Sequence, residues 1–424
     1  MSEARDLFRQ LFPITRSVAG QGNRRTLRIL SRVSPLRLLE IPSGTRCFDW
    51  VVPREWNLRE AFIEDSRGRR ILDAREHNLH CVNYSEPVDR IVPRDELLSC
   101  LHTLPSLPRA IPYVTSYYQP RWGFCVQHSR LRRFRGRRFR VRIRAEKKKG
   151  SMTLGEAVVR GRSPEEILFS TYICHPSMAN NELSGPILQS LLLRHVRTLQ
   201  KPHYTYRFVF CPETVGSIAY LHLRGRQLKK KVRAGYVITC VGMSGKFTYK
   251  KSRPGNSLAD RTALAVLAEQ GEKFEVRPWV PSGSDERQYG SPGFRLPVGS
   301  LMTRMYGQYP EYHTSLDNLG LIDFPKFQAC LELYQKIIAR LETNRTYLGA
   351  VQHGEPNLGK RSLYPTLGGQ KKNTDQLRAI RTVCAFADGR TDLLEIAQAS
   401  GIPFATLAEA AEKLRAVGLL RVVR

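Results

Sequence analysis

The sequence predicts an α/β protein with a small inserted β-rich domain and a C-terminal winged helix. Three changes in sequence pattern along the 424 residues support this prediction. Strand-like and helical segments alternate from 151 to 345, which is typical of an α/β sheet. Short strand-like runs broken by proline and glycine occupy 36–125, and the last part of the chain predicts three helices followed by a strand.

These patterns divide the chain into domains. We expect an α/β domain built from 1–35 and 126–345, interrupted by the inserted β-rich domain at 36–125. A linker rich in Gly, Pro and Lys at 346–373 then leads to the winged-helix domain at 374–424.

Helices and strands can be placed from periodicity and caps. Residues 6–34 predict a helix pair, with a turn at Gly20–Gly22 before the second helix. In the α/β domain we expect strands at 167–174, 206–211, 235–241 and 297–302, and helices near 186–199, 216–228, 257–270 and 324–342. In the β-rich domain, strands are expected at 38–41, 47–52, 71–73 and 111–115.

Composition and charge limit the cellular environments and partners that this protein can have. The formal net charge of +30 favours a polyanionic partner, although a general preference for arginine over lysine explains it equally well. The sequence lacks a signal-peptide pattern and a long apolar run, so we expect a cytoplasmic protein without a membrane span. The nine cysteines contain no Cys-x-x-Cys pair, which predicts reduced, buried thiols.

The stretch 130–149 carries twelve Arg or Lys residues and one acid, Glu146. Its strict alternation predicts a strand with Phe139, Val141 and Ile143 facing inward and a row of arginines facing outward. Two interpretations stay open: a solvated strand face, or a surface that contacts a polyanion.

Caps and apolar spacing define the winged helix. Thr374 and Thr391 are predicted N-caps, Pro403 a first helical residue and Gly418 a helix stop. The third helix should bury Phe404, Leu407, Ala408, Ala411 and Leu414, which leaves Thr406, Glu409, Glu412 and Lys413 exposed. Two acids do not suit a phosphate-lined groove, so we expect this domain to dock a partner or form a homo-oligomer rather than bind nucleic acid.

Three residues at strand ends are candidate metal ligands. His175 follows the predicted strand 167–174, Glu213 follows 206–211, and His313 lies in a loop before the helix at 324–342. Two imidazoles and one carboxylate leave a tetrahedral zinc ion with one open position, which is the pattern of a catalytic site. For each residue alone, a hydrogen-bonded core histidine or a surface glutamate is the simpler interpretation.

Longer motifs carry a resemblance to a known family. The chain resembles bacterial proteins with an aminopeptidase-like domain, often labelled polysaccharide-biosynthesis proteins, and more distantly the co-catalytic zinc aminopeptidases. The resemblance implies a zinc-aminopeptidase-like mixed sheet flanked by helices. Its carriers are Leu11–Ile14, Phe48–Asn57, Ile111–Cys125, the His175 loop, Pro212–Ser217, Gly283–Tyr289 and Tyr312–Ser315.

The sequence departs from the co-catalytic pattern at several positions. Asn181 stands where the resemblance expects the Asp that bridges two metals, and Pro212 stands where it expects the general base. The further Asp ligand has no counterpart after 236–240. The resemblance therefore implies one zinc ion rather than two, held by His175, Glu213 and His313, with Asn181 as a weaker candidate ligand.

The missing base leaves several candidates open. Glu182, Asp285 and Glu286 are candidate catalytic bases, and either of the last two is also a candidate fourth ligand. The aromatic residues Tyr113, Tyr117, Tyr118, Trp122 and Phe124 either line the cleft or pack in the core.

Three functions follow as hypotheses. The first is a zinc-dependent hydrolase that cleaves an amide bond in a small peptide-like substrate. The second is a catalytically degenerate scaffold that keeps the fold and uses it for binding. The third is a nucleic-acid binder that uses the arginine strand and the winged helix.

Overall fold

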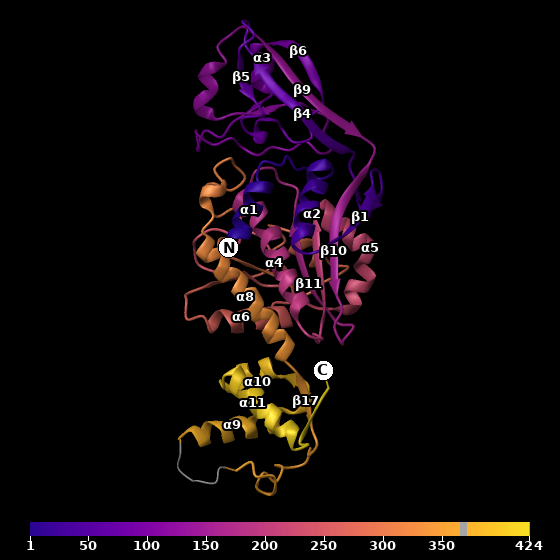
Figure 1. Cartoon of the computed structure of the whole chain (residues 1–424), viewed down its shortest axis with the longest axis vertical. Helices are drawn as coiled ribbons and strands as arrows, with labels where there is room; N and C mark the ends of the chain where they lie inside the picture. Colours follow the sequence, from indigo (N-terminus) through magenta and orange to yellow (C-terminus); the bar gives the residue numbers. More distant parts are fainter. Residues whose placement is uncertain (365–370, 424) are drawn as a thin grey trace. The chain divides into compact units, whose positions relative to one another are not determined.

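The computed structural model describes residues 1–364 and 371–423. The chain forms two compact units, Met1–Asp260 with Glu272–Gln335, and Arg261–Gly271 with Lys336–Arg424. The first unit contains the α/β domain and the inserted β-rich domain, and the second contains the winged helix (Figure 1).

A mixed eight-stranded sheet forms the centre of the first unit. Its strands run in the order β1 (Arg37–Pro42), β10 (Ser151–Val159), β12 (Thr205–Cys211), β11 (Glu166–Tyr172), β13 (Val232–Val237), β16 (Val298–Met302), β14 (Thr248–Lys250) and β15 (Glu275–Arg277). Strands β12, β11, β13 and β16 are mutually parallel, whereas β1 and β10 are antiparallel to their neighbours. Every residue of β11 and β12 is buried, as expected for strands covered on both faces. The α/β prediction is confirmed.

Helices cover this sheet. They are α1 (Ser2–Leu11), α2 (Gln21–Val33), α4 (Ser184–Thr198), α5 (Val215–Lys231), α6 (Leu258–Ala268), the short α7 (Glu286–Tyr289) and α8 (Phe324–Thr343). Of these, α4, α5, α6 and α8 begin within two residues of the predicted positions, whereas the short α7 was not predicted. Glycine sets how closely α4 approaches the sheet, because a Cβ atom on Gly185 would lie 2.3 Å from the carbonyl oxygen of Ile238. This contact places the start of α4 against the carboxyl ends of the parallel strands.

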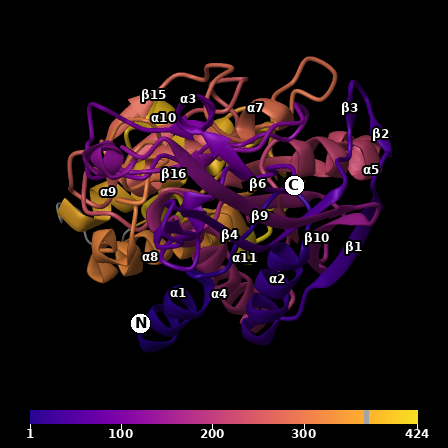
Figure 2. The same ribbon diagram turned by 90° about the horizontal axis from the view of Figure 1, so that it is seen from above.

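The inserted domain is organised by a four-stranded sheet in the order β5 (Arg70–Asp73), β4 (Glu55–Glu64), β9 (Arg138–Lys148) and β6 (Val88–Pro93), seen from above in Figure 2. Shorter elements complete it: β2 (Arg46–Cys47), β3 (Trp50–Val51), α3 (Arg94–Ser99), β7 (Leu101–His102) and β8 (Phe124–Cys125).

Strand pairing corrects the predicted limits of 36–125 for this domain. β1 belongs to the main sheet because it pairs with β10, and β9 belongs to the inserted sheet because it pairs with β4 and β6. Local sequence indicates that a segment is extended but does not identify its partner strand. The strand expected at 111–115 is also absent, and Pro112 makes only an isolated bridge, to Thr314.

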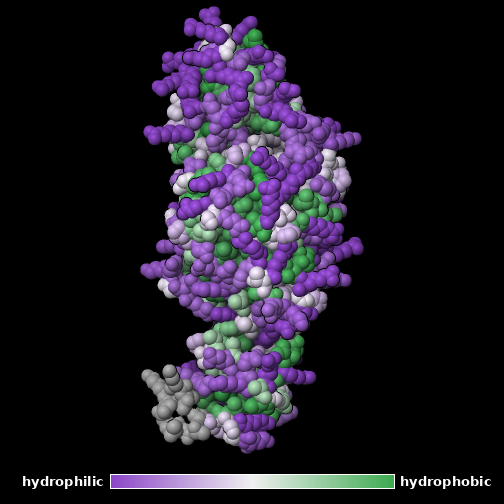
Figure 3. Space-filling model, viewed as in Figure 1, coloured by the Kyte–Doolittle hydropathy of each residue, from purple (hydrophilic) through white to green (hydrophobic). Residues whose placement is uncertain are grey.

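The basic strand β9 has the predicted alternation. Phe139, Val141 and Ile143 are buried, and the arginines between them face outward, where the surface of the inserted domain is mostly hydrophilic (Figure 3). Arg140 and Arg142 form ion pairs with Asp89, and Arg142 also pairs with Glu60. Acids on the neighbouring strands thus neutralise part of the arginine row.

The second unit confirms the winged helix. It contains α9 (Lys371–Phe386), α10 (Leu393–Ser400), α11 (Phe404–Ala416) and a sheet in the order β18 (Asp388–Asp392), β17 (Thr346–Gly349), β19 (Leu420–Val422). The predicted linker therefore begins with a strand of this domain, and its residues 365–370 lie outside the described residues.

Details of the caps differ from the predictions. Helix α9 begins at Lys371, before the predicted cap Thr374. Asp392, not Thr391, caps α10, because its carboxylate accepts the Glu395 N–H in a capping box. In α11, Ala410 is buried and Ala408 only half-buried, whereas Glu409, Glu412 and Lys413 are exposed as predicted.

Two sequence-level expectations about the whole chain can be compared with the structure. All nine cysteines are free thiols, and seven of them are buried. Among the described helices, none combines the length and the apolar character needed to cross a membrane.

Asp73 provides a test of the inserted domain's stability. Its carboxylate is nearly buried and accepts hydrogen bonds from Arg70 and Arg75. Burial raises the pKa of Asp73, but the bonds from Arg75 and Arg70 outweigh burial and lower it to about 2. The ionised Asp73 carboxylate therefore contributes its full stabilisation of the folded state above the unfolded-state pKa of about 3.9. This stabilisation is lost as the pH falls toward 2.

We predict that Asp73→Asn lowers the free energy of unfolding at pH 7 by about 1 kcal/mol, a modest effect because Arg75 is 72% exposed and screened by solvent. Denaturant titration of both proteins between pH 7 and pH 2 measures this difference, which should shrink as the pH falls. Asp95→Asn, at a carboxylate that is 98% exposed, is the matched control and should change little. An equal loss for the two variants would contradict the prediction.

Candidate metal centre

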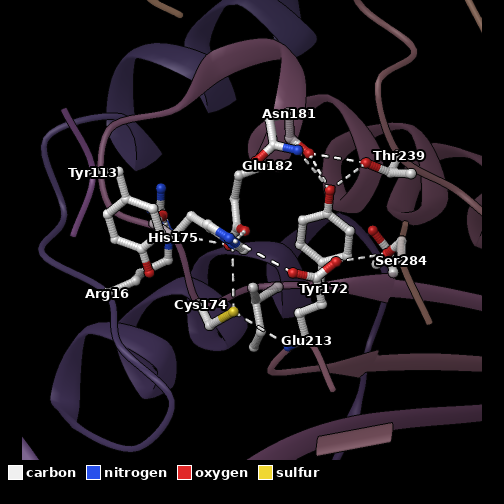
Figure 4. Close-up of polar contacts among 12 residues, drawn as sticks. Arg16, Tyr113, Tyr172, Cys174, His175, Asn181, Glu182, Glu213, Thr239 and Ser284 are labelled. Carbon is white, nitrogen blue, oxygen red and sulfur yellow. Dashed lines mark hydrogen bonds and ion pairs between the residues drawn. The ribbon is translucent and has the colours of Figure 1, made fainter. Parts of the chain in front are cut away.

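His175 lies just beyond the carboxyl end of β11, in the loop that leads to helix α4 (Figure 4). The buried backbone between them includes Ser177, with φ of 44°, and a π-helical turn at Ala179–Leu183. The imidazole is buried, with 6% of the side chain exposed. The loop therefore presents His175 at the sheet edge where α/β folds commonly bind ligands.

The two ring nitrogens of His175 face different carboxylates. Nδ1 lies 2.7 Å from Glu182 Oε2, and Nε2 lies 3.7 Å from Glu213 Oε2. Burial lowers the pKa of His175, but the hydrogen bond with Glu182 and the charges of both glutamates outweigh burial and raise it. When the imidazole is neutral, a proton on Nδ1 shared with Glu182 leaves the lone pair of Nε2 directed to the Glu213 side.

Glu213 follows β12 and is held from two sides. The Ser284 hydroxyl donates to Oε1 at 2.8 Å, and the Glu213 backbone N–H donates to Cys174 Sγ at 3.2 Å. Burial raises the pKa of Glu213, while His175 and the Ser284 hydrogen bond act in the opposite direction. With 21% of its side chain exposed, Glu213 lies closer to solvent than His175 does.

His313 completes the predicted ligand group. Its ring centroid lies 5.1 Å from that of His175, and Tyr312 stacks on it at 4.0 Å. Burial and the neighbouring His175 lower the pKa of His313 to about 3, so the imidazole is neutral at pH 7. Its Nε2 is buried and has no hydrogen-bond partner within the described chain. A buried lone pair of this kind is available to a metal ion.

Two of these residues, His175 and Glu213, are spaced for a shared divalent metal ion. Two ligands bound to a tetrahedral zinc ion at 2.0–2.1 Å lie about 3.4 Å apart. The 3.7 Å between His175 Nε2 and Glu213 Oε2 is close to this value. Among the described residues, the group of three donors found within 4.8 Å of one another is Cys174, His175 and Glu182, which includes neither Glu213 nor His313. The structure thus brings the His175 and Glu213 donors close together and places the His313 ring beside that of His175.

Tyr113 from the inserted domain borders the same group. Its ring centroid lies 5.0 Å from that of His175 and 5.5 Å from that of His313. The Tyr113 hydroxyl shares a hydrogen bond with that of Tyr117, whereas Phe124 is fully buried in the core. Of the two roles considered for the aromatic residues, Tyr113 therefore takes the first and Phe124 the second.

Glu182, predicted as a base, lies behind His175 and pairs with Arg16. Neither side chain is exposed, and Arg16 Nε lies 3.5 Å from Glu182 Oε1. Arg16 also donates to the carbonyl oxygens of His175 and Leu11, at 2.9 and 2.7 Å. Burial lowers the pKa of Arg16, and the Glu182 charge counters this effect. Sequence analysis missed Arg16, because nothing local separates it from the other 67 basic residues.

Asp317 is a second residue that the sequence analysis missed. Its carboxylate accepts the backbone N–H groups of Ala179, Asn180 and Asn181 at 3.1, 2.7 and 2.9 Å. The Tyr309 hydroxyl donates to it as well, at 3.2 Å. Asp317 thereby joins the loop that carries His313 to the turn that carries Glu182. Its place shortly after His313 was the only signal that could have identified it.

Asn181 does not join the His175 group in the described structure. Its side-chain amide donates to the Tyr172 hydroxyl at 2.8 Å, and its backbone oxygen accepts from Tyr172 and Thr239. The Asn181 Oδ1 atom is buried and has no hydrogen-bond partner among the described residues, so the candidate ligand role for Asn181 stays a prediction.

The two remaining candidate bases are in different surroundings. Asp285 Oδ1 accepts the Thr214 N–H and the Ser217 hydroxyl, both at 2.8 Å, and Oδ2 is buried without a partner among the described residues. Burial and the Glu213 charge raise the pKa of Asp285 to about 7. Glu286 instead pairs with Lys250 and Tyr306 in a separate buried cluster. The prediction for Glu286 is corrected accordingly, whereas Asp285 remains next to the Glu213 loop.

Comparison with known proteins identifies the family. A family described as a domain of unknown function (DUF4910) matches residues 5–344, and a winged helix-turn-helix family matches 345–422. The chain belongs to this DUF4910 family. Another protein, from Clostridium acetobutylicum, is 41% identical over 421 residues, 99% of this chain and 96% of its own, and its provisional name combines polysaccharide biosynthesis with an aminopeptidase-like domain.

Solved structures agree with the family assignment. A Clostridium acetobutylicum crystal structure with the provisional name of a peptidase is 40% identical, with a TM-score of 0.90, and the match covers 100% of this chain and 96% of that one. The zinc aminopeptidase BSAP from Bacillus subtilis has a TM-score of 0.58 at 11% identity, over 80% of this chain and 94% of its own. The distant match shows a common fold, and the aminopeptidase-like architecture predicted for this chain is confirmed.

We predict that Asp317→Ala lowers the free energy of unfolding by about 2–4 kcal/mol, because the buried N–H groups of Asn180 and Asn181 lose their acceptor, whereas the Ala179 N–H keeps the Asp317 backbone oxygen. Chemical denaturation measures the change. Asp323→Ala is the control, since it removes one backbone hydrogen bond, to Lys326, and should cost about 1 kcal/mol. Equal losses would show that Asp317 is no more than an ordinary cap.

Proposed function

We propose that this protein is a metal-dependent hydrolase of aminopeptidase type that cleaves an amide bond in a small, peptide-like substrate. The observation that supports the proposal best is the convergence of His175, Glu213 and His313, three donors from three separate segments. The buried, unpartnered Nε2 of His313 has no structural function within the described chain and suits a metal ligand.

In this proposal, His175, Glu213 and His313 hold one divalent ion, with zinc as the expected metal. A bound zinc ion supplies Lewis-acid chemistry, polarising a carbonyl group and activating water near neutral pH. Glu182 acts as the residue that orients His175, because its carboxylate holds Nδ1 at 2.7 Å.

The proton acceptor is proposed to be Asp285. Its Oδ2 is free of hydrogen bonds to described residues, and its pKa of about 7 allows it to accept and return a proton near neutral pH. Ser217 and the Thr214 N–H fix the other oxygen, Oδ1, and so set the orientation of the carboxylate. Pro212, where a base is expected from the resemblance, has no group that transfers a proton.

Charge around the site supports one ion rather than two. A second cation needs further carboxylate ligands, and the best-placed one, Glu182, is already paired with Arg16. Asn181 is neutral, and its amide is engaged by Tyr172. The Arg16 guanidinium thus supplies buried positive charge beside Glu182 without a metal.

The alternative function is a catalytically degenerate protein that keeps the fold for binding. Asn181 and Pro212, which depart from the co-catalytic pattern, favour this alternative. The two functions differ in whether the metal-loaded protein turns over an amide substrate.

A metal and turnover experiment tests the proposal. We expect the purified protein to bind about one zinc ion per chain and to hydrolyse at least one member of a panel of aminoacyl amides. His175→Ala and His313→Ala should lose both properties, whereas His353→Ala, at an exposed histidine, should keep them. Metal is quantified by mass spectrometry and turnover by amine release.

The outcomes separate the hypotheses. If the protein bound none of the tested divalent ions stoichiometrically, the metal site itself would be refuted. Stoichiometric metal without turnover across the panel would favour the degenerate binding protein. Turnover that survives Glu213→Gln and Asp285→Asn would reject the roles given to these two residues.

The role of Glu182 yields a further prediction. Glu182→Gln should weaken zinc affinity by about 10- to 100-fold, because an amide holds the His175 Nδ1 proton less strongly than a carboxylate. Competition with a chromophoric chelator measures the affinity. Glu332→Gln, at an exposed glutamate on α8, is the matched control. Unchanged affinity in Glu182→Gln would assign this residue to packing with Arg16 alone.

A further inference from the structure

A cavity lies at the opposite end of the parallel strands from His175. Its volume is about 820 Å³, and the start of β11, the start of β12 and one side of α5 contribute to its walls. Strand β11 runs from Glu166, at this cavity, to Tyr172, near His175, which separates the two sites by about 20 Å at 3.3 Å per residue. The cavity is therefore distinct from the candidate metal centre.

Positive charge dominates the walls of this cavity. Two carboxylates, Glu156 and Glu166, face six cationic side chains: Arg37, Arg160, Arg162, Arg207, Arg224 and Lys231. A concave surface with an excess of one charge sign concentrates the electrostatic potential inside it. The cavity therefore favours anions.

The two carboxylates are already engaged by one buried arginine. Arg207 binds Glu166 through two hydrogen bonds, of 2.6 and 3.0 Å, and donates to Glu156 at 2.7 Å. Tyr220 also donates to Glu156, at 2.6 Å, and Gln227 donates to Glu166, at 2.9 Å. These contacts engage both acids, so that beyond Arg207 only Arg224 lies within 4 Å of either one among the cations of this cavity.

Four of the remaining cations are unpaired. Within residues 1–364 and 371–423, Arg37, Arg160, Arg162 and Lys231 have no carboxylate within 4 Å. Arg224 reaches Glu156 only at 3.8 Å. Solvated arginines on an open surface separate freely, whereas these side chains line one hollow, where like charges concentrate positive potential.

We propose that this cavity binds a small organic molecule with two or more linked phosphate groups, such as a nucleoside diphosphate. Arginine side chains bind phosphate oxygens in a bidentate manner, and four unpaired cations match the charge of a diphosphate. The volume lies in the range of 300–1,000 Å³ that small-molecule sites occupy and exceeds what inorganic phosphate alone requires. A hollow with converging walls suits a small ligand better than the extended backbone of a nucleic acid.

Isothermal titration calorimetry of the full chain with adenosine diphosphate, pyrophosphate and orthophosphate tests this proposal. We expect one adenosine diphosphate per chain, pyrophosphate binding to the same site, and at least tenfold weaker binding of orthophosphate. Arg160→Ala/Arg162→Ala should weaken adenosine diphosphate binding at least tenfold, while Arg160→Lys/Arg162→Lys should retain part of it. Circular dichroism confirms that these exposed substitutions leave the fold intact.

The matched control removes the same charge from another surface. Arg132→Ala/Arg133→Ala changes two exposed arginines of the inserted domain and should alter the affinity less than twofold. Three outcomes would overturn the proposal: no binding of either diphosphate at low salt, equal weakening by both double alanine variants, or tighter binding of a single-stranded oligonucleotide that is lost in the Arg160/Arg162 variant.

Discussion

The buried contact between Glu182, His175 and Arg16 is the constraint on which the candidate centre depends. The side chains of Arg16 and Glu182 are both fully buried, so each needs the opposite charge of the other to offset the cost of desolvation. Glu182 also fixes the imidazole of His175, and Arg16 fixes the backbone carbonyl of the same residue. One ion pair therefore sets both the ring and the main chain of the central histidine.

The same contact explains why the N-terminal segment belongs to the α/β domain. Arg16 lies between α1 and α2 and reaches the loop after β11, while Asn23 of α2 donates to the carbonyl oxygen of Ile173 in that loop. The centre is thus assembled from the N-terminal helices, the loops after β11 and β12, and the segment around His313. Because these segments are far apart in the chain, each residue of the centre is held by a different rigid element.

Sequence patterns predicted the helices and strands better than the pairing of the strands and the long-range contacts between side chains. The buried strands and the helices of the α/β domain follow from apolar periodicity, and His175, Glu213 and His313 follow from their places at strand ends and in a loop. The partner strands of β1 and β9 were not predictable, because pairing depends on distant segments. Arg16 and Asp317 were missed for the same reason: their roles arise only from contacts with residues far away in the chain.

The contact between the inserted domain and the His313 segment has a consequence for how this protein can be divided. Ile111 exchanges backbone and side-chain hydrogen bonds with Ser315, and the Tyr113 N–H donates to the carbonyl oxygen of His313. Excision of the inserted domain would leave these groups of the His313 segment without their partners. The insertion is thus a structural support of the centre, and shortening this protein to its α/β domain would remove one wall of the site.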